Sequence, residues 1–241
     1  MVEFERNAEA EGQRVVETFN TVDARMVQKG AKERVDLTER EGQEAVRLSF
    51  EPLSVKNLEE AQALCNVVFA LEGETASKDL ESSLSRVSNA DTTFTEGLYW
   101  LAKDSSGRVA GITGVYGLVG DKPQHCWLGW FALKPSLRGH TLGTQMLEFT
   151  MKEAEKQEKT NLYIISSDHP DMAGNAKFYH QNDCPIVAVL NSFGSHVGTD
   201  GRQLPQSIIR GTREHYRSFI DGGVNIFIRR RKLEKGLQNQ G

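Results

Sequence analysis

The stretch Trp130–Lys156, WFALKPSLRGHTLGTQMLEFTMKEAEK, decides which fold we expect for this chain. It begins as an apolar strand, breaks at Pro135, crosses a short turn and continues as an amphipathic helix. A helix N-terminus leaves its first backbone N–H groups unpaired and carries about half of a positive charge. A turn with little side-chain bulk at that point lets a diphosphate approach closely enough to accept hydrogen bonds from those groups.

The residues of this turn suit an anion chemically. Two of them are glycines that give access, two carry positive or donor groups, and two threonine hydroxyls can donate hydrogen bonds. We therefore expect diphosphate binding by Arg138, Gly139, His140, Thr141, Leu142, Gly143 and Thr144. Taken alone, the turn fits equally well a strand-to-helix connection in which a glycine serves only packing.

The composition is that of an ordinary globular protein. The chain has 241 residues, of which 38% are hydrophobic and 26% charged, so it can bury a sizeable core. The formal net charge of -4 gives no general attraction to nucleic acid or to anionic membrane. No apolar run approaches the roughly 20 residues that span a bilayer. We expect neither a nucleic-acid partner nor a membrane partner.

Cysteine and histidine usage argues against a disulfide framework and against a metal site. The three cysteines, Cys65, Cys126 and Cys184, are odd in number and form no Cys-x-x-Cys pair. The six histidines are dispersed, without the spacing of metal ligands. The acidic N-terminus lacks the apolar core of a signal peptide, so a cytoplasmic location is expected.

Residues 1–44 are predicted to form a helical extension. Val15, Phe19, Val22 and Met26 recur at helical spacing and would form one apolar stripe. This stripe would either pack on the chain's own domain or join two copies as a homodimer.

The pattern from residue 45 onward predicts a domain of mixed strands and helices. We expect strands at 45–53, 97–103, 108–120, 125–133, 161–166, 185–190 and 222–230, and helices at 57–69, 77–87, 142–156 and 173–183. Asn57 and Glu60 fit a capping box at the start of the first of these helices. The strand at 125–133 should be buried on both faces, and the strand–helix–strand order after it predicts a right-handed parallel crossover.

The basic run Arg229–Lys232 directly follows an apolar strand. We interpret it as a solvated strand end, with a phosphate-binding patch as the alternative.

Three separated motifs resemble the GNAT superfamily of N-acetyltransferases. The strand end WFAL followed by a proline and RGHTLG is similar to the family's acetyl-CoA-binding segment. AKFYHQND (176–183) resembles the family's helix with the pattern Ala-x-x-Phe-Tyr. Residues 212–233 resemble the segment with which many members of the family end. The resemblance covers about residues 45–235, with the motifs in the family's order.

This resemblance implies a fold and an activity. The fold would be mixed α/β, a mostly antiparallel twisted sheet with a central, splayed parallel strand pair flanked by helices. The activity would be transfer of an acetyl group from acetyl-CoA, as a substrate, to a primary amine of a small molecule or amino acid. It also implies that Tyr179 protonates the departing thiolate. The backbone of Phe131, Ala132 and Leu133 would pair with the pantetheine amides, and Asn175 would contact the cofactor.

The chain departs from the family pattern at several points. Thr141 replaces a glycine, Asp183-Cys184 stands where Gly-Phe is usual, and about 191–212 is an insertion that we expect over the acceptor side. No carboxylate lies within 125–133 to act as the general base, and His125, Asp168, Glu214 and His215 are weak alternatives. The alternative function is therefore a non-catalytic acyl-CoA sensor or interaction module of the same fold.

Overall fold

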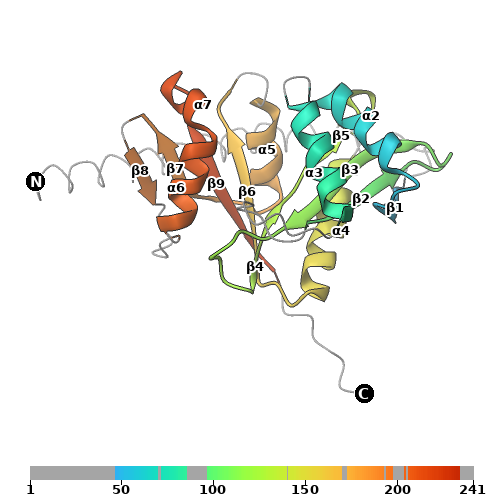
Figure 1. Ribbon diagram of the computed structural model, residues 1–241, viewed down its shortest axis with the longest axis horizontal. Helices are drawn as coiled ribbons and strands as arrows, with labels where there is room; N and C mark the ends of the chain where they lie inside the picture. Colours follow the sequence, from blue (N-terminus) through green and yellow to red (C-terminus); the bar gives the residue numbers. More distant parts are fainter. Residues whose placement is uncertain are drawn as a thin grey trace, which may run out of the picture. The chain divides into compact units, whose positions relative to one another are not determined.

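The computed structural model describes residues 47–69, 72–85, 97–139, 141–169, 173–192, 194–197, 204 and 206–233 (Figure 1). The apolar stripe expected at 15–26 lies outside these residues. The described residues form two compact units, one of 47–162 with 232 and 233, the other of 163–231.

The first unit is built on antiparallel strands. β1 (Ser49–Pro52), β2 (Leu98–Lys103), β3 (Val109–Tyr116) and β4 (His125–Leu128) are neighbours in that order, and β5 (Ala132–Leu133) also pairs with β3. The chain therefore returns to β3 twice, first with β4 and then with β5.

A tight turn at Asp104–Gly107 joins β2 to β3. The Asp104 carboxylate accepts hydrogen bonds from the backbone N–H groups of Ser106, at 2.9 Å, and Arg108, at 3.1 Å. Gly107 has a φ of 78°, which a glycine adopts without steric cost.

The expectation of one continuous strand over 125–133 is wrong, because a β-bulge divides it. Leu128 lies opposite Val115, and Ala132 lies opposite Ile112. Three residues, 129–131, therefore face the two residues 113 and 114 on β3. One extra residue on one strand of an antiparallel pair bends that strand and re-aims its side chains.

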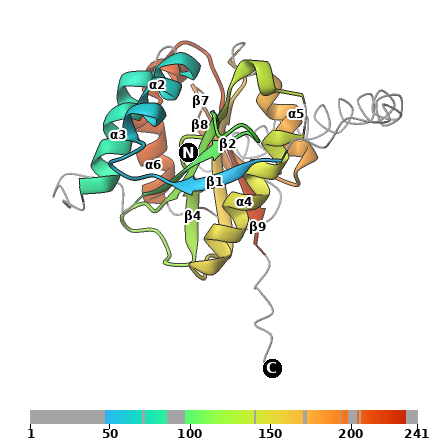
Figure 2. The same cartoon turned by 90° about the vertical axis from the view of Figure 1, so that its right-hand side faces the viewer.

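Two helices cover one face of these strands and a third covers the other face (Figure 2). α2 (Leu58–Val68) and α3 (Gly73–Ser85) pack on the first face, while α4 (Leu142–Lys156) packs on the second. Along β2 the buried side chains alternate, since Leu101 joins the cluster with α2 and α3 and Ala102 joins the cluster with α4.

The capping box expected at the start of α2 is wrong in its contacts. α2 does begin after Asn57, but the Asn57 side chain makes no cap hydrogen bond. Its Oδ1 instead accepts from the Ser54 N–H at 2.8 Å, and its Nδ2 donates to the Pro52 carbonyl at 3.1 Å. Asn57 thus shapes the loop before the helix.

α4 connects β4 and β5 to β6 (Asn161–Ser167), as the strand–helix–strand pattern predicted. β4 and β6 begin side by side: the Thr160 N–H donates to the Gln124 carbonyl at 2.8 Å, and the Cys126 thiol donates to the Asn161 carbonyl at 3.6 Å. The fold class expected from the sequence, mostly antiparallel strands with one parallel pair and flanking helices, is confirmed.

In the second unit the strand order is β6-β9-β7-β8. β7 (Ile186–Asn191) pairs antiparallel with β8 (Gly194–Val197) and with β9 (Ile226–Lys232). The helices of this unit are α5 (Ala173–Gln181), α6 (Gln206–His215) and α7 (Arg217–Asp221), and α7 contacts β7 (Figure 1).

The stretch 191–212, in which the sequence suggested only an insertion without periodic pattern, contains the strand β8 and most of α6. Ile208, Ile209 and Thr212 of α6 are buried. These three residues have helical spacing, but one of them is a polar threonine, so the apolar pattern that would predict a helix is weak.

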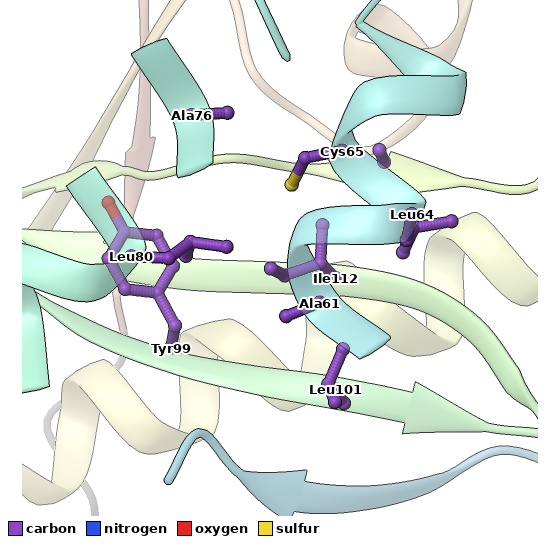
Figure 3. Close-up of a cluster of buried hydrophobic side chains, with 9 residues drawn as sticks. Ala61, Leu64, Cys65, Ala76, Leu80, Tyr99, Leu101 and Ile112 are labelled. Atoms are coloured by element: carbon purple, nitrogen blue, oxygen red, sulfur yellow. The ribbon is translucent and has the colours of Figure 1, made fainter. Parts of the chain in front are cut away.

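Three glycines of the first unit make room for one aromatic ring. A Cβ added at Gly97, Gly114 or Gly129 would lie 2.9 Å or less from a carbon of the Tyr99 ring. Tyr99 belongs to the cluster that α2 and α3 form with β2 and β3, shown in Figure 3. Gly114 of β3 therefore accommodates this ring.

We predict that Gly114→Ala destabilises the protein by about 1–3 kcal/mol, the usual cost of overpacking a core. The added Cβ would lie 2.2 Å from the Tyr99 Cδ1 and 2.7 Å from the Leu98 carbonyl oxygen, so the backbone itself must shift. Gly211→Ala in α6 is the control, since its Cβ would meet nothing within 4 Å and should stabilise the helix. Chemical denaturation measures both, and an unchanged midpoint for Gly114→Ala would contradict the packing.

Candidate functional site

The turn before α4 is shaped by two residues in the left-handed region. After the short 3-10 helix η1 (Pro135–Leu137), Gly139 has a φ of 87° and Thr141 a φ of 60°. For a residue with a side chain this conformation costs about 1–2 kcal/mol, which is why a glycine would suit position 141. Thr141 is nevertheless the N-cap of α4, and its side chain makes no cap hydrogen bond.

The first backbone N–H groups of α4 bind no acceptor that lies in the described part of the chain. The Gln145 N–H donates to the Thr141 carbonyl at 3.1 Å, which is the first bond of the helical ladder. Among the described residues, the N–H groups of Leu142, Gly143 and Thr144 find no acceptor. These donors converge on one point and carry the positive end of the helix dipole, so they can bind a phosphate group.

The position of this N-terminus is fixed by close packing of α4 on β3. A Cβ at Gly111 would lie 2.6 Å from the Ala132 carbonyl oxygen and 2.9 Å from the Met146 sulfur. Farther along, the buried hydroxyls of Thr113 and Thr150 lie 2.6 Å apart and share a hydrogen bond. No side chain therefore separates helix and strand at Gly111.

The strand before the turn has one edge that pairs with β3 and one that does not. The Lys134 N–H donates to the Ala110 carbonyl at 2.9 Å. Because bonded pairs alternate in an antiparallel ladder, Ala132 directs its backbone groups toward β3. Leu133 directs its backbone groups to the opposite edge of the strand, where its carbonyl accepts a hydrogen bond from the Arg138 Nε at 3.3 Å.

Tyr179 lies in α5 and is only 6% exposed. Burial raises the pKa of its hydroxyl above the usual value, the Cys184 thiol adds to this, and the charge of Arg229 lowers the pKa. In the part of the chain that the structure describes, no hydrogen-bond partner meets this hydroxyl. Tyr179 therefore carries its proton at neutral pH and can donate it.

The interpretation of Arg229–Lys232 as a solvated strand end is wrong for its first two residues. Arg229 is 0% and Arg230 8% exposed. The Arg229 Nε donates to the Ser166 hydroxyl at 3.1 Å, and its Nη1 donates to the Cys184 carbonyl at 3.1 Å. The burial of Arg229 could not be predicted from the sequence, because a charged run at a strand end is usually exposed.

The weak candidates for a general base differ in their surroundings. Asp168 uses both carboxylate oxygens to bind Asn225, at 2.8 Å and 2.6 Å, and so joins the end of β6 to the start of β9. The His125 Nδ1 lies 2.9 Å from the nearly buried Asp121 carboxylate, whose second oxygen accepts from the Trp127 indole at 3.1 Å. A carboxylate in this position orients the imidazole ring.

Two other residues were expected to bind the cofactor. Asn175 is exposed on α5, and His140 lies outside the described residues.

All three cysteines are buried and free. Burial raises the pKa of the Cys184 thiol to about 12, so it is no nucleophile at neutral pH.

The described residues hold no group of three or more metal-ligating side chains. Within the same residues, no helix combines the length and apolar character that crossing a membrane requires.

The model of the acetyltransferase (GNAT) family matches residues 65–182, a segment that contains the bulge, the turn, α4 and Tyr179. The chain contains a GNAT acetyltransferase domain. No curated protein sequence matches the chain.

Solved structures agree with this domain at the level of the fold. A protein from Desulfovibrio desulfuricans assigned to the GNAT acetyltransferase family has a TM-score of 0.56 and 14% identity, over 78% of this chain and 100% of that one. The IAA acetyltransferase from Bacillus cereus has a TM-score of 0.51 and 14% identity, over 78% and 100%. A GNAT family acetyltransferase from Elizabethkingia anophelis with acetyl-CoA bound has a TM-score of 0.50 and 12% identity, over 77% and 98%.

In a GNAT acetyltransferase domain the group to be bound is acetyl-CoA, and the turn before α4 fits its diphosphate. The unpaired N–H groups are the right donors, and a Cβ at Gly139 would meet nothing within 4 Å, so the approach is open. Arg138 is exposed beside it. An arginine suits phosphate oxygens because its guanidinium is always charged and presents several donors.

We predict that Gly143→Val weakens acetyl-CoA binding about 10–100-fold, the loss of one or two charge-assisted hydrogen bonds. The branched side chain would stand where the diphosphate meets the helix N-terminus. Gly143→Ala, which adds a single methyl group, should lose less. Calorimetric titration measures both affinities, and full affinity in a folded Gly143→Val protein would show that the cofactor binds elsewhere.

Proposed function

We propose that this protein transfers the acetyl group of acetyl-CoA to a primary amine of a small molecule or amino acid. The observation that carries the proposal is that the N–H groups of Leu142, Gly143 and Thr144, within a GNAT acetyltransferase domain, have no acceptor among the described residues. The amine nitrogen attacks the thioester carbonyl, the carbon–sulfur bond breaks, and the products are an amide and free coenzyme A.

In this proposal the backbone edge at Phe131 and Leu133 binds the pantetheine arm. The alternation of the ladder supports these two residues, because Ala132 already pairs with β3. Arg138 holds the Leu133 carbonyl and has further donors for a phosphate oxygen.

Tyr179 is the proposed general acid. A thiolate leaves more readily when a proton reaches the sulfur as the carbon–sulfur bond breaks. The hydroxyl is protonated at neutral pH, and no partner among the described residues competes for it. The phenol proton would pass to sulfur, and the amine proton would restore the phenol.

The amine must also lose a proton, because a free alkylammonium has a pKa of about 10.4. The species that attacks is the neutral amine, which forms when this proton passes to water.

The proposed acceptor is cationic before it reacts. The formal net charge of -4 favours the approach of such an amine. We place the stretch 191–212, which carries β8 and part of α6, on the acceptor side, so that it would contribute to the choice of amine.

A second candidate function is a sensor that binds acyl-CoA without turnover. Two observations favour it: Thr141 stands with a φ of 60° where a glycine is usual, and no carboxylate lies within 125–133. The buried, protonated Tyr179 hydroxyl favours the enzyme instead.

We predict that Tyr179→Phe lowers kcat about 10²–10⁴-fold, the usual contribution of a general acid. The ring remains, so the fold and the affinity for acetyl-CoA should stay near those of the native protein. Release of the coenzyme A thiol, followed with a panel of amines, gives kcat and KM. A loss confined to KM for acetyl-CoA would make Tyr179 a binding residue, and a native protein that turns over no amine would favour the sensor.

A further inference from the structure

The C-terminal end of α5 closes in a Schellman motif that contains Tyr179. The Cys184 N–H donates to the Tyr179 carbonyl at 2.9 Å, and the Asp183 N–H donates to the His180 carbonyl at 3.1 Å. These are the two bonds of that motif, and its left-handed position, usually a glycine, is held by Asp183 with a φ of 58°. An aspartate tolerates this conformation less well than a glycine.

Consecutive arginines of β9 hold this turn in place. The buried Arg229 donates to the Cys184 carbonyl at 3.1 Å, and the backbone N–H of Arg230 donates to the Pro185 carbonyl at 3.0 Å. Arg231 reaches the Asp183 carboxylate, with 2.8 Å between its Nη1 and the carboxylate oxygen. The residues that depart from the family's Gly-Phe pattern are therefore the ones that β9 contacts.

We propose that Arg229 is a positioning residue for Tyr179, holding the turn that ends α5 so that the Tyr179 hydroxyl is directed for proton donation. The connection has two hydrogen bonds: Arg229 to the Cys184 carbonyl, and the Cys184 N–H to the Tyr179 carbonyl. Arg229 is itself fixed from a second strand, because its Nε binds the Ser166 hydroxyl of β6. This inference rests on the proposed function, in which Tyr179 is the acid.

The electrostatics agree with this geometry. A general acid works best when its pKa lies near the operating pH. Burial moves the pKa of Tyr179 upward, away from that range, and the Arg229 guanidinium moves it back down. The same cation would also stabilise negative charge that develops near the phenol.

A double-mutant cycle separates positioning from general stability. In the native background Arg229→Met should lower kcat about 10²-fold, the effect expected of a misplaced catalytic group, with KM for acetyl-CoA nearly unchanged. In the Tyr179→Phe background the same substitution should change kcat by less than about 3-fold, because the group it positions is gone. Lys232→Met is the matched control on β9, an exposed neighbour that should leave kcat unchanged.

An equal fold-loss in both backgrounds would overturn the inference, since Arg229 would then act independently of Tyr179. If Arg229→Met does not fold, Arg229→Lys takes its place, because it keeps the charge but not the two-point hydrogen bonding. It should show the same dependence on Tyr179 with a smaller loss.

Amide hydrogen exchange at Cys184 tests, without an activity assay, whether Arg229 holds the turn that ends α5. We call this contact between Arg229 and the turn the clamp. Arg229→Met should speed exchange there and Lys232→Met should not; unchanged exchange in both would overturn the clamp. A native protein that acetylates no amine in the panel contradicts the proposed function and removes the catalytic role of the clamp. The exchange result then still decides whether Arg229 fixes the end of α5.

Discussion

The close approach of α4 to β3 is the constraint on which the rest of the first unit depends. With no side chain at Gly111, the Met146 sulfur reaches the strand, and the Thr113–Thr150 hydrogen bond secures the next turns of the helix. The start of α4 is thereby held beside the end of β5. A left-handed turn at Gly139 and Thr141 then joins strand and helix, and the first helical N–H groups have no partner in the described part of the chain. The proposed cofactor site thus follows from how helix and strand pack.

Much of this arrangement could be predicted from the sequence, and the failures have physical reasons. The turn, α4 and α5 follow from short-range periodicity and turn residues. The bulge at 129–131 did not, because an apolar run does not reveal the register it takes against β3. The contacts of Asn57 were also missed, since its side chain had a choice between the helix start and the preceding loop.

Arg229, which we propose positions Tyr179, shows where reasoning from composition fails. A charge at a strand end is normally solvated, and only the fold reveals that this one is buried among hydrogen-bond acceptors. A signal was present, however. Asp183 occupies a helix end where glycine is preferred, and a compensating partner was to be expected elsewhere in the chain. Arg231 pairs with its carboxylate, and Arg229 binds the next residue.

The central claim is acetyl transfer to an amine, and following the acetyl group itself tests it most directly. The native protein would be incubated with acetyl-CoA labelled isotopically in the acetyl group and with a mixture of primary amines, and the products analysed by mass spectrometry. We expect the label in an amide of one or a few amines, with an equal amount of coenzyme A released. Acetyl-CoA that is bound but never transferred, or is only hydrolysed, would contradict the account and leave a protein that binds the thioester without using it.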